Sequence, residues 1–322
     1  MADSEQKKLI KFGNSSFIIT LPKPWIDKNK LKKGDLIFLE ETASNELVIN
    51  TQEKKEKNTK SIELNFESMK LKDFERELIS AYINNYSEIN IVGKGLNLKT
   101  NIISKAIQDK VGLEISEQSA DKVIVRDVLD LEAMSLEKVV RRLDNMLRAI
   151  FDEIKEGIKM GKIKDWSIKE IINIEGGINK FYYLSWKIIR KCQEDPKLLN
   201  KLKLSSRKIS DIQWVVLHLE YIGDELKRMA KILHTDGVFD QKRLLLTLEN
   251  IEAGYIDMIS SFYNEDLESA RKLMATKSSR IEMCDKLLVS ESRLPNGAEK
   301  VVEKMKSISG FIHNISRVIG YY

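Results

Sequence analysis

Glu220-Tyr-Ile-Gly-Asp224 lies within a long amphipathic stretch, Ser206–Leu233, whose pattern predicts a helix. Glu220 and Asp224 are four residues apart, so their carboxylates lie on one helical face with about 6 Å between the Cβ atoms. Gly223 costs about 1 kcal/mol relative to alanine in a helix interior, and it marks the close approach of another helix or a ligand. The apolar face of this helix carries Ile209, Ile212, Val216, Leu219, Leu226, Ala230 and Leu233.

Two interpretations of these carboxylates stay open. Like charges this close repel each other unless a metal ion, a basic partner or water relieves them. Glu220 and Asp224 are therefore candidate metal ligands. Alternatively they belong to a solvated helix face, on which Lys227 and Arg228 pair with Asp224 for a few tenths of a kcal/mol each.

Composition favours a mainly helical protein of two or three domains. The chain has 322 residues, of which 42% are hydrophobic and 32% charged, with only 4 prolines and 15 glycines. Cys192 and Cys284 occupy apolar positions of helical patterns, which predicts buried thiols in a reducing compartment. The first residues do not resemble a signal peptide, and no apolar run reaches the ~18 residues of a membrane span. We expect a cytoplasmic protein without membrane insertion.

Residues 1–52 form a first predicted domain. The expected order is strand, turn, strand, short helix, strand, turn, strand, over residues 8–12, 17–21, 25–29, 36–40 and 46–50. A unit of about 45 residues is too small to support a stable core alone, so we expect it to dimerise.

Charge is distributed unevenly within this domain. Between Lys7 and Gly34 there are eight lysines and one acid, Asp27, whereas residues 35–46 hold four acids and no basic residue. This separation predicts one cationic face that suits nucleic acid, although the net charge of the whole chain is only +5. The lysines are Lys7, Lys8, Lys11, Lys23, Lys28, Lys30, Lys32 and Lys33.

Three short motifs give the domain a family resemblance. Gly13-Asn-Ser-Ser16, Ile19-Thr-Leu-Pro-Lys23 and Leu31-Lys-Lys-Gly-Asp35 together resemble the SpoVT-AbrB (MazE-like) fold. Pro22 can open the short helix, and Gly34 can take the turn into the next strand. The resemblance implies a swapped-hairpin β-barrel, formed by two copies of the chain, that binds double-stranded DNA.

The resemblance also implies a DNA-binding surface. Its lysines would neutralise phosphates, and its amide and hydroxyl side chains would donate to phosphates or reach base edges. Arginine is absent from this region, and lysine makes the bidentate contact to guanine less well. The implied DNA-binding residues are Lys8, Lys11, Asn14, Ser15, Ser16 and Lys23.

A charged linker over residues 53–60 precedes a small α/β domain over 61–130. Strands are expected at 61–66, 88–92, 113–116 and 122–128, with helices at 72–85 and 98–111. Gly93-Lys-Gly95 follows a strand and precedes a helix, which invites comparison with phosphate-binding loops. The full phosphate-loop pattern is absent, so we interpret these residues as a plain turn.

Residues 131–322 show helical periodicity throughout. Apolar residues at three-four spacing predict six helices that pack as a bundle, in two repeats over 131–236 and 237–322. Leu219–Leu226 aligns with Met305–Ile312, and Ile178-Asn179 aligns with Ile281-Glu282. The six helices extend over 136–154, 168–188, 206–233, 244–262, 267–288 and 301–319.

This duplicated three-helix bundle, together with the Glu-x-Ile-Gly-Asp motif, resembles PhoU-type proteins. The resemblance implies that acidic helix motifs bind iron or zinc and that the protein regulates phosphate uptake. In the second repeat, Lys306, Gly310 and Ser278 replace the expected acids, so one metal site would remain. The residues implied for it are Glu220, Asp224, Glu175 and Asn179, the last being an amide and a weaker ligand.

The predicted fold class is thus a multidomain α+β chain that is mainly α-helical. The expected function is transcriptional regulation of phosphate uptake, with DNA bound by the N-terminal dimer and a signal sensed or relayed by the PhoU-like bundle. This combination resembles an archaeal family that joins both modules in one chain. The alternative is an adaptor that contacts the ATPase of a phosphate transporter and uses its N-terminal domain only to dimerise.

Enzymatic activity has little support in the sequence. His218, His234 and His313 are scattered, and no pairing of a nucleophile with a base can be identified. We therefore do not expect an enzyme.

Overall fold

The chain folds as two compact units, Met1–Asn58 and Thr59–Tyr322. The computed structural model describes residues 6–14, 16–41, 47–51, 60–289 and 296–320. Most described residues are helical, and strands are confined to the first unit and to the start of the second. The predicted linker over 53–60 lies outside the described residues, apart from Lys60.

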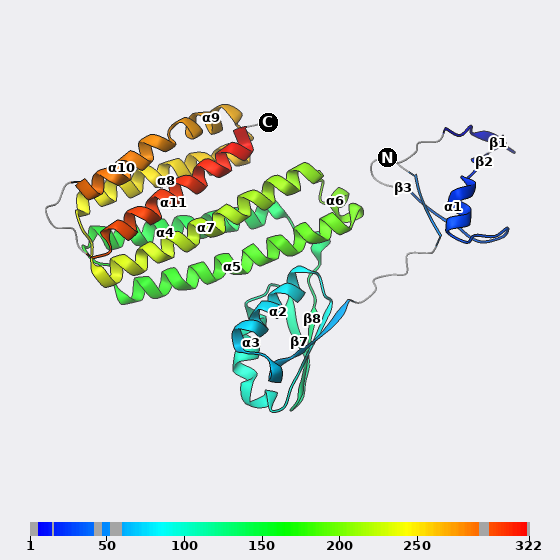
Figure 1. Ribbon diagram of the computed structural model, residues 1–322, viewed down its shortest axis with the longest axis horizontal. Coiled ribbons are helices and arrows are strands. Elements are labelled where there is room, and N and C mark those ends of the chain that lie inside the picture. Colours follow the sequence, from blue (N-terminus) through cyan, green and yellow to red (C-terminus); the bar gives the residue numbers. More distant parts are fainter. Residues whose placement is uncertain (1–5, 15, 42–46, 52–59, 290–295, 321–322) are drawn as a thin grey trace. The chain divides into compact units, whose positions relative to one another are not determined.

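The first unit consists of two hairpin-like strand pairs and one short helix (Figure 1). β1 (Ile10–Phe12) pairs antiparallel with β2 (Ser16–Ile18), and β3 (Phe38–Glu41) pairs antiparallel with β4 (Leu47–Asn50). α1 (Lys23–Lys28) lies between the two pairs in sequence. The predicted order of elements is therefore confirmed for the described residues. One chain forms two separate two-stranded sheets, so the two-chain barrel stays a prediction.

The turns of this unit follow from its proline and glycine residues. Pro22 is the N-cap of α1, as predicted, because its fixed φ suits a helix start. Gly34 adopts a φ of 98°, which favours glycine over other residues. Around Gly34, the Asp35 amide donates to the Lys32 carbonyl over 3.1 Å, and the Lys32 amide donates to Asp35 Oδ2 over 2.7 Å. The predicted turn at residues 33–35 is confirmed.

The second unit begins with a four-stranded sheet in the order β5-β6-β8-β7. β5 and β6 are parallel, and the other neighbouring pairs are antiparallel. Its core is mainly apolar, with Phe74, Leu78, Ile89 and Ile91 inaccessible to solvent. The elements, all close to their predicted positions, are β5 (Ser61–Asn65), α2 (Leu71–Ile83), β6 (Glu88–Val92), α3 (Thr100–Gln108), β7 (Leu113–Gln118) and β8 (Lys122–Asp127).

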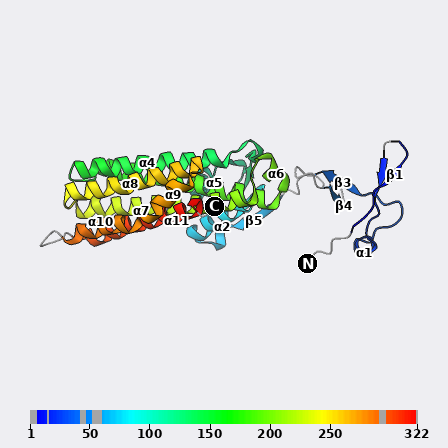
Figure 2. The ribbon, with the colours of Figure 1, turned by 90° about the horizontal axis from the view of Figure 1, so that it is seen from above.

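Long helices make up the rest of the second unit and lie side by side along one direction (Figures 1 and 2). α4, α5 and α7 contact one another, and α8 contacts α9, α10 and α11. Contacts between α7 and α11 and between α4 and α8 join these two groups around one continuous apolar core. The long helices are α4 (Leu136–Lys159), α5 (Asp165–Glu194), α7 (Ser206–Asp236), α8 (Gln241–Asn264) and α11 (Ala298–Gly320).

Two short features differ from the prediction. The single helix expected over 267–288 is wrong, because it is interrupted at Thr276 into α9 (Leu267–Ala275) and α10 (Lys277–Val289). The Thr276 hydroxyl donates to the Leu273 carbonyl over 2.9 Å, a local bond that competes with helix continuation. A further short helix, α6 (Pro196–Lys201), occupies part of the connection between the second and third predicted helices, with Asp195 as its cap.

The helices differ from membrane spans in composition. Across the described ranges, no helix combines the length and the apolar character that crossing a bilayer requires.

Candidate functional site

Three lysines predicted to contact DNA are exposed in the first unit. Lys8 precedes β1, Lys11 lies within β1 opposite Phe17 of β2, and Lys23 is the first residue of α1. Within the described part of the chain, none of the three forms an ion pair with a carboxylate. Their ammonium groups are therefore available to an anionic partner.

The polar side chains predicted to contact DNA surround the β1–β2 turn. Asn14 lies in the turn beside Gly13, whose φ of 68° is a left-handed conformation. Ser16 begins β2 and is exposed, and Ser15 lies outside the described residues. The hairpin thus presents Asn14, Ser16 and Lys11 to solvent within a few residues of one another.

The first unit has no core of its own among the described residues. None of its described side chains is buried, and β1 and β2 expose both faces. Phe12 is 66% exposed, Phe17 64% and Leu36 79%. Apolar side chains at this level of exposure favour association with further apolar surface. The large apolar side chains exposed here are Leu9, Ile10, Phe12, Phe17, Ile18, Ile19, Leu36, Ile37, Leu39, Leu47 and Val48.

The residues predicted as metal ligands form a cluster around one lysine of the helical region. Lys227 Nζ lies 2.7 Å from Glu175 Oε1 and 2.8 Å from Asp224 Oδ1. Asn179 Nδ2 donates to the same Glu175 oxygen over 2.7 Å, and Arg228 lies 2.7 Å from Asp224 Oδ2. The structure therefore brings Glu175, Asn179 and Asp224 together from α5 and α7. The pairing of Asp224 with Lys227 and Arg228 that the alternative interpretation expected is present, but Glu175 is buried, so the cluster is not a solvated helix face.

Glu220 interacts with the same cluster through the charges of its members. Burial, together with the charges of Asp224 and Glu175, raises the pKa of Glu220 to about 7. Burial also acts on Asp224, but hydrogen bonds and charge from Lys227 outweigh it and hold the pKa of Asp224 below its usual value. Glu220 therefore exchanges a proton near neutral pH, whereas Asp224 stays ionised.

The donor set of this cluster does not fit a metal ion in its present arrangement. The ammonium group of Lys227 lies between the two carboxylates, where an ion would have to bind. Among the described residues, no group of three or more His, Cys, Asp or Glu side chains is suitably placed to hold a metal. The arrangement is an ion-pair network between two helices, and the metal site stays a prediction.

Gly223 is explained by close packing against two helices. A Cβ atom at this position would lie 3.0 Å from Ile178 Cδ1 of α5 and 3.3 Å from Leu147 Cδ2 of α4. The prediction that this glycine marks the approach of another helix is confirmed. It lets α7 lie close enough to α5 for Lys227 to reach Glu175.

The Gly93-Lys-Gly95 segment is a turn whose amide groups already have acceptors within the protein. The Gly95 amide donates to Asp121 Oδ1 over 3.1 Å, and the Gly93 amide donates to the Asp121 carbonyl over 3.1 Å. Carboxylates close to these amides disfavour an anionic ligand. This geometry agrees with the interpretation as a plain turn.

A buried ion pair that was not predicted joins the α/β region to the helices. Lys187 of α5 is inaccessible to solvent, and its Nζ lies 2.6 Å from Asp127 Oδ2 at the end of β8. The same ammonium lies 4.7 Å from the centre of the Tyr82 ring. The sequence contained one signal, because Lys187 interrupts an apolar face that contains Leu184 and Ile188.

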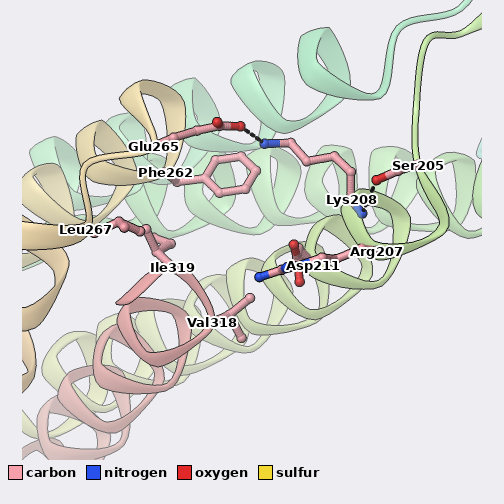
Figure 3. A pocket seen from close by; sticks show the side chains of 9 residues that line it. All are labelled: Ser205, Arg207, Lys208, Asp211, Phe262, Glu265, Leu267, Val318 and Ile319. Carbon is pink, nitrogen blue, oxygen red and sulfur yellow. Dashed lines mark hydrogen bonds and ion pairs between the residues drawn. The ribbon is translucent and has the colours of Figure 1, made fainter. Parts of the chain in front are cut away.

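An apolar cleft of about 350 Å³ lies where α7 begins and α8 and α11 end (Figure 3). Phe262, Val318 and Ile319 form its apolar wall. Lys208 extends past the Phe262 ring and pairs with Glu265, as Figure 3 shows. The lysine nearest to this cleft is therefore neutralised by the chain's own carboxylate.

Comparison with known proteins gave a match for the N-terminal segment of the chain. No curated protein and no solved structure matches the chain. Residues 10–60 match the protein family described as antidote-toxin recognition MazE, bacterial antitoxin. This match covers β1 to β4 and supports the predicted SpoVT-AbrB-like N-terminal domain. The PhoU-like character of the helical region stays a prediction.

Proposed function

We propose that this protein is a DNA-binding transcriptional regulator whose N-terminal segment forms the DNA-binding dimer. The observation that carries the proposal is the pairing of two properties in one small segment. Its apolar side chains lack a cover, and its lysines Lys8, Lys11 and Lys23 lack a counter-charge among the described residues. A second copy of the segment would cover the apolar side chains, and DNA would supply the counter-charge.

Dimerisation follows from the energetics of the exposed strands. Each fully buried large apolar side chain contributes about 1.5–3 kcal/mol relative to its exposed state. Even partial covering of Phe12, Phe17 and Leu39 in two copies would offset the cost of association. The match of residues 10–60 to a MazE-type family supports this arrangement, because domains of this type often dimerise and bind DNA.

Binding to DNA would depend mainly on phosphate contacts. Each lysine that neutralises a phosphate releases a counterion, so affinity falls steeply as the salt concentration rises. No arginine is present in residues 1–60, which limits bidentate recognition of guanine. Asn14 and Ser16 are the described side chains that could reach base edges in addition to phosphates.

The proposal is tested by fluorescence anisotropy of full-length protein on duplex DNA from its own upstream region, over a series of salt concentrations. In a Lys8→Ala/Lys11→Ala/Lys23→Ala variant, we expect the slope of log affinity against log salt to fall by about 0.9 for each phosphate that is no longer neutralised. The matched control replaces three exposed lysines of the helical region, Lys169, Lys242 and Lys300, with alanine. Equal binding by the wild type and the first variant would contradict the proposal.

The helical region would relay the signal that the regulator responds to. Its resemblance to PhoU-type proteins supports a role in phosphate uptake, with the Glu220 cluster as the sensing element. A ligand that binds one arrangement of the helices better than another would change the population of DNA-competent dimers. The alternative remains an adaptor that contacts a phosphate-transporter ATPase. Absence of DNA binding at low salt, combined with retained dimerisation, would favour that adaptor.

A further inference from the structure

A polar groove of about 520 Å³ runs between α8 and the α9–α10 pair. It is lined mainly by hydroxyl, amide and charged side chains, in contrast to the apolar cleft at the start of α7. Arg280 of α10 forms part of its wall and is only 5% exposed. A groove built around an almost completely buried guanidinium needs a physical explanation.

The charge of Arg280 is only partly compensated by the protein. Its Nη1 group donates to Thr276 Oγ1 over 2.7 Å, and its Nη2 group donates to the Leu273 carbonyl over 3.3 Å. Both acceptors are neutral, and Nε is buried without a hydrogen-bond partner. Within the described ranges Arg280 forms no ion pair. Burial lowers the pKa of Arg280, and the more distant carboxylate of Asp257 opposes this effect only in part.

The surrounding backbone is shaped to hold the guanidinium at the groove. A Cβ atom on Gly254 of α8 would lie 3.3 Å from Arg280 Nη1, so the missing side chain lets the guanidinium lie against α8. The interruption between α9 and α10 supplies the other contacts, since the Leu273 carbonyl and the Thr276 hydroxyl both lie at that break. In one continuous helix a backbone amide would occupy the Leu273 carbonyl, which here accepts a hydrogen bond from Arg280 Nη2.

The charges around the groove indicate which kind of molecule would fit. The positive Arg280 and Lys272 are balanced by the negative Asp257 and Asp266, so the lining has no net formal charge. A polyanion would be repelled by these two carboxylates. A molecule with one negative group and several hydroxyl or amine donors would satisfy both kinds of side chain.

We propose that this groove binds a small polar molecule whose single oxyanion group, a carboxylate or a phosphate, pairs with Arg280. Its hydroxyl or amine groups would donate to Asp257 and to hydroxyl and amide side chains such as Ser260 and Asn264. Arginine suits this role because its planar fork matches both carboxylate and phosphate. The inference concerns the second unit alone and does not depend on DNA binding.

The thermal stability of an Arg280→Met variant, measured without ligand, shows whether Arg280 serves binding or supports the fold. If Arg280 is retained for a ligand, Arg280→Met removes a poorly compensated buried charge, so the ligand-free protein keeps or gains thermal stability. If Arg280 is a structural group, the same change lowers the melting temperature. A lowered melting temperature would by itself be sufficient to overturn the proposal.

Binding is tested on full-length protein by thermal shift and isothermal titration calorimetry, in chloride buffer at constant ionic strength. The probes are inorganic phosphate, glycerol 3-phosphate, glycerate and L-serine, which separate phosphate from carboxylate as the recognised group. We expect at least one probe to raise the melting temperature saturably, as a ligand that binds only the native state must. Arg280→Lys should weaken that binding at least about tenfold, because the bidentate geometry is lost.

A second variant leaves Arg280 unchanged. Ala253→Trp places a bulky side chain in the groove from an exposed position of α8 and should abolish binding. Leu246→Trp and Lys242→Met, on exposed parts of α8 outside the groove, are the matched controls and should bind like the wild type. The proposal is wrong if none of the probes binds saturably, or if wild-type binding persists in either Arg280→Met or Ala253→Trp.

Discussion

The pKa of Glu220 is set by the groups that surround its carboxyl group. Burial and two neighbouring carboxylates raise its pKa from 4.5 to about 7. Between these pH values the native state keeps a proton that the unfolded state has released. The stability of the native state therefore falls as pH rises through this range, and the full loss is reached above about pH 7.

Replacing Glu220 with glutamine removes the group that ionises. We expect Glu220→Gln to exceed the wild type in stability by about 1–2 kcal/mol at neutral to alkaline pH, allowing for partial exposure of the side chain. The difference should shrink as the pH falls toward about 4.5. Urea unfolding at several pH values measures it, with the exposed Glu170→Gln as control. A difference that does not vary with pH would show that Glu220 has an ordinary pKa.

At the scale of elements, the α/β region is attached to α5 by a buried charge pair. Lys187 has no exposed surface, and its partner Asp127 is 12% exposed. Burial tends to lower the pKa of Lys187, and the nearby Asp127 limits that effect. Removal of one partner would leave the other charge buried and uncompensated.

Lys187→Met tests this attachment. We expect a loss of about 3–5 kcal/mol in the free energy of unfolding, because Asp127 would keep its charge in a buried position. A Lys187→Met/Asp127→Asn double variant should recover part of that loss. Urea unfolding of the wild type, both single variants and the double variant gives the coupling energy. A single variant within about 1 kcal/mol of the wild type would mean that the pair contributes little.

The elements also show where periodicity fails as a predictor. The apolar positions of α9 and α10 keep the same helical phase on either side of the polar residues 276–279, so the pattern alone predicts one helix. Thr276 ends α9 because its hydroxyl bonds locally to the Leu273 carbonyl. That competition is decided by side-chain geometry, which apolar spacing does not contain.

At the scale of the whole molecule, the first unit leaves many large apolar side chains exposed in a single copy. We expect the full chain to be a dimer and a Phe17→Asp/Leu39→Asp variant to be monomeric, because charges on these strands oppose burial against a second copy. Sedimentation velocity measures the change. Leu98→Asp, at an 87% exposed position of the second unit, is the control and should remain dimeric. A wild-type monomer at micromolar concentration would contradict the expected dimer.

The sequence alone determined the order of elements in the first unit and the positions of the long helices. Turn residues indicated the order of elements in the first unit, because Pro22 has a fixed φ and Gly34 accepts a positive φ that other residues disfavour. Three-four spacing located the long helices, because one apolar face per helix must be buried. Gly223 indicated close helix packing, and the uneven lysine distribution indicated a cationic segment. These inferences succeed because they depend on local conformation or on periodicity.

Tertiary structure alone decided which charges meet. Lys227 lies among residues that the sequence marked as metal ligands, Lys187 joins Asp127 from a distant strand, and Arg280 lies buried without a carboxylate partner among the described residues. Each arrangement depends on side chains far apart in the chain, brought together by the packing of α5, α7, α8 and α10. Electrostatic energy depends on distance and burial, and neither quantity can be obtained from spacing along one helix.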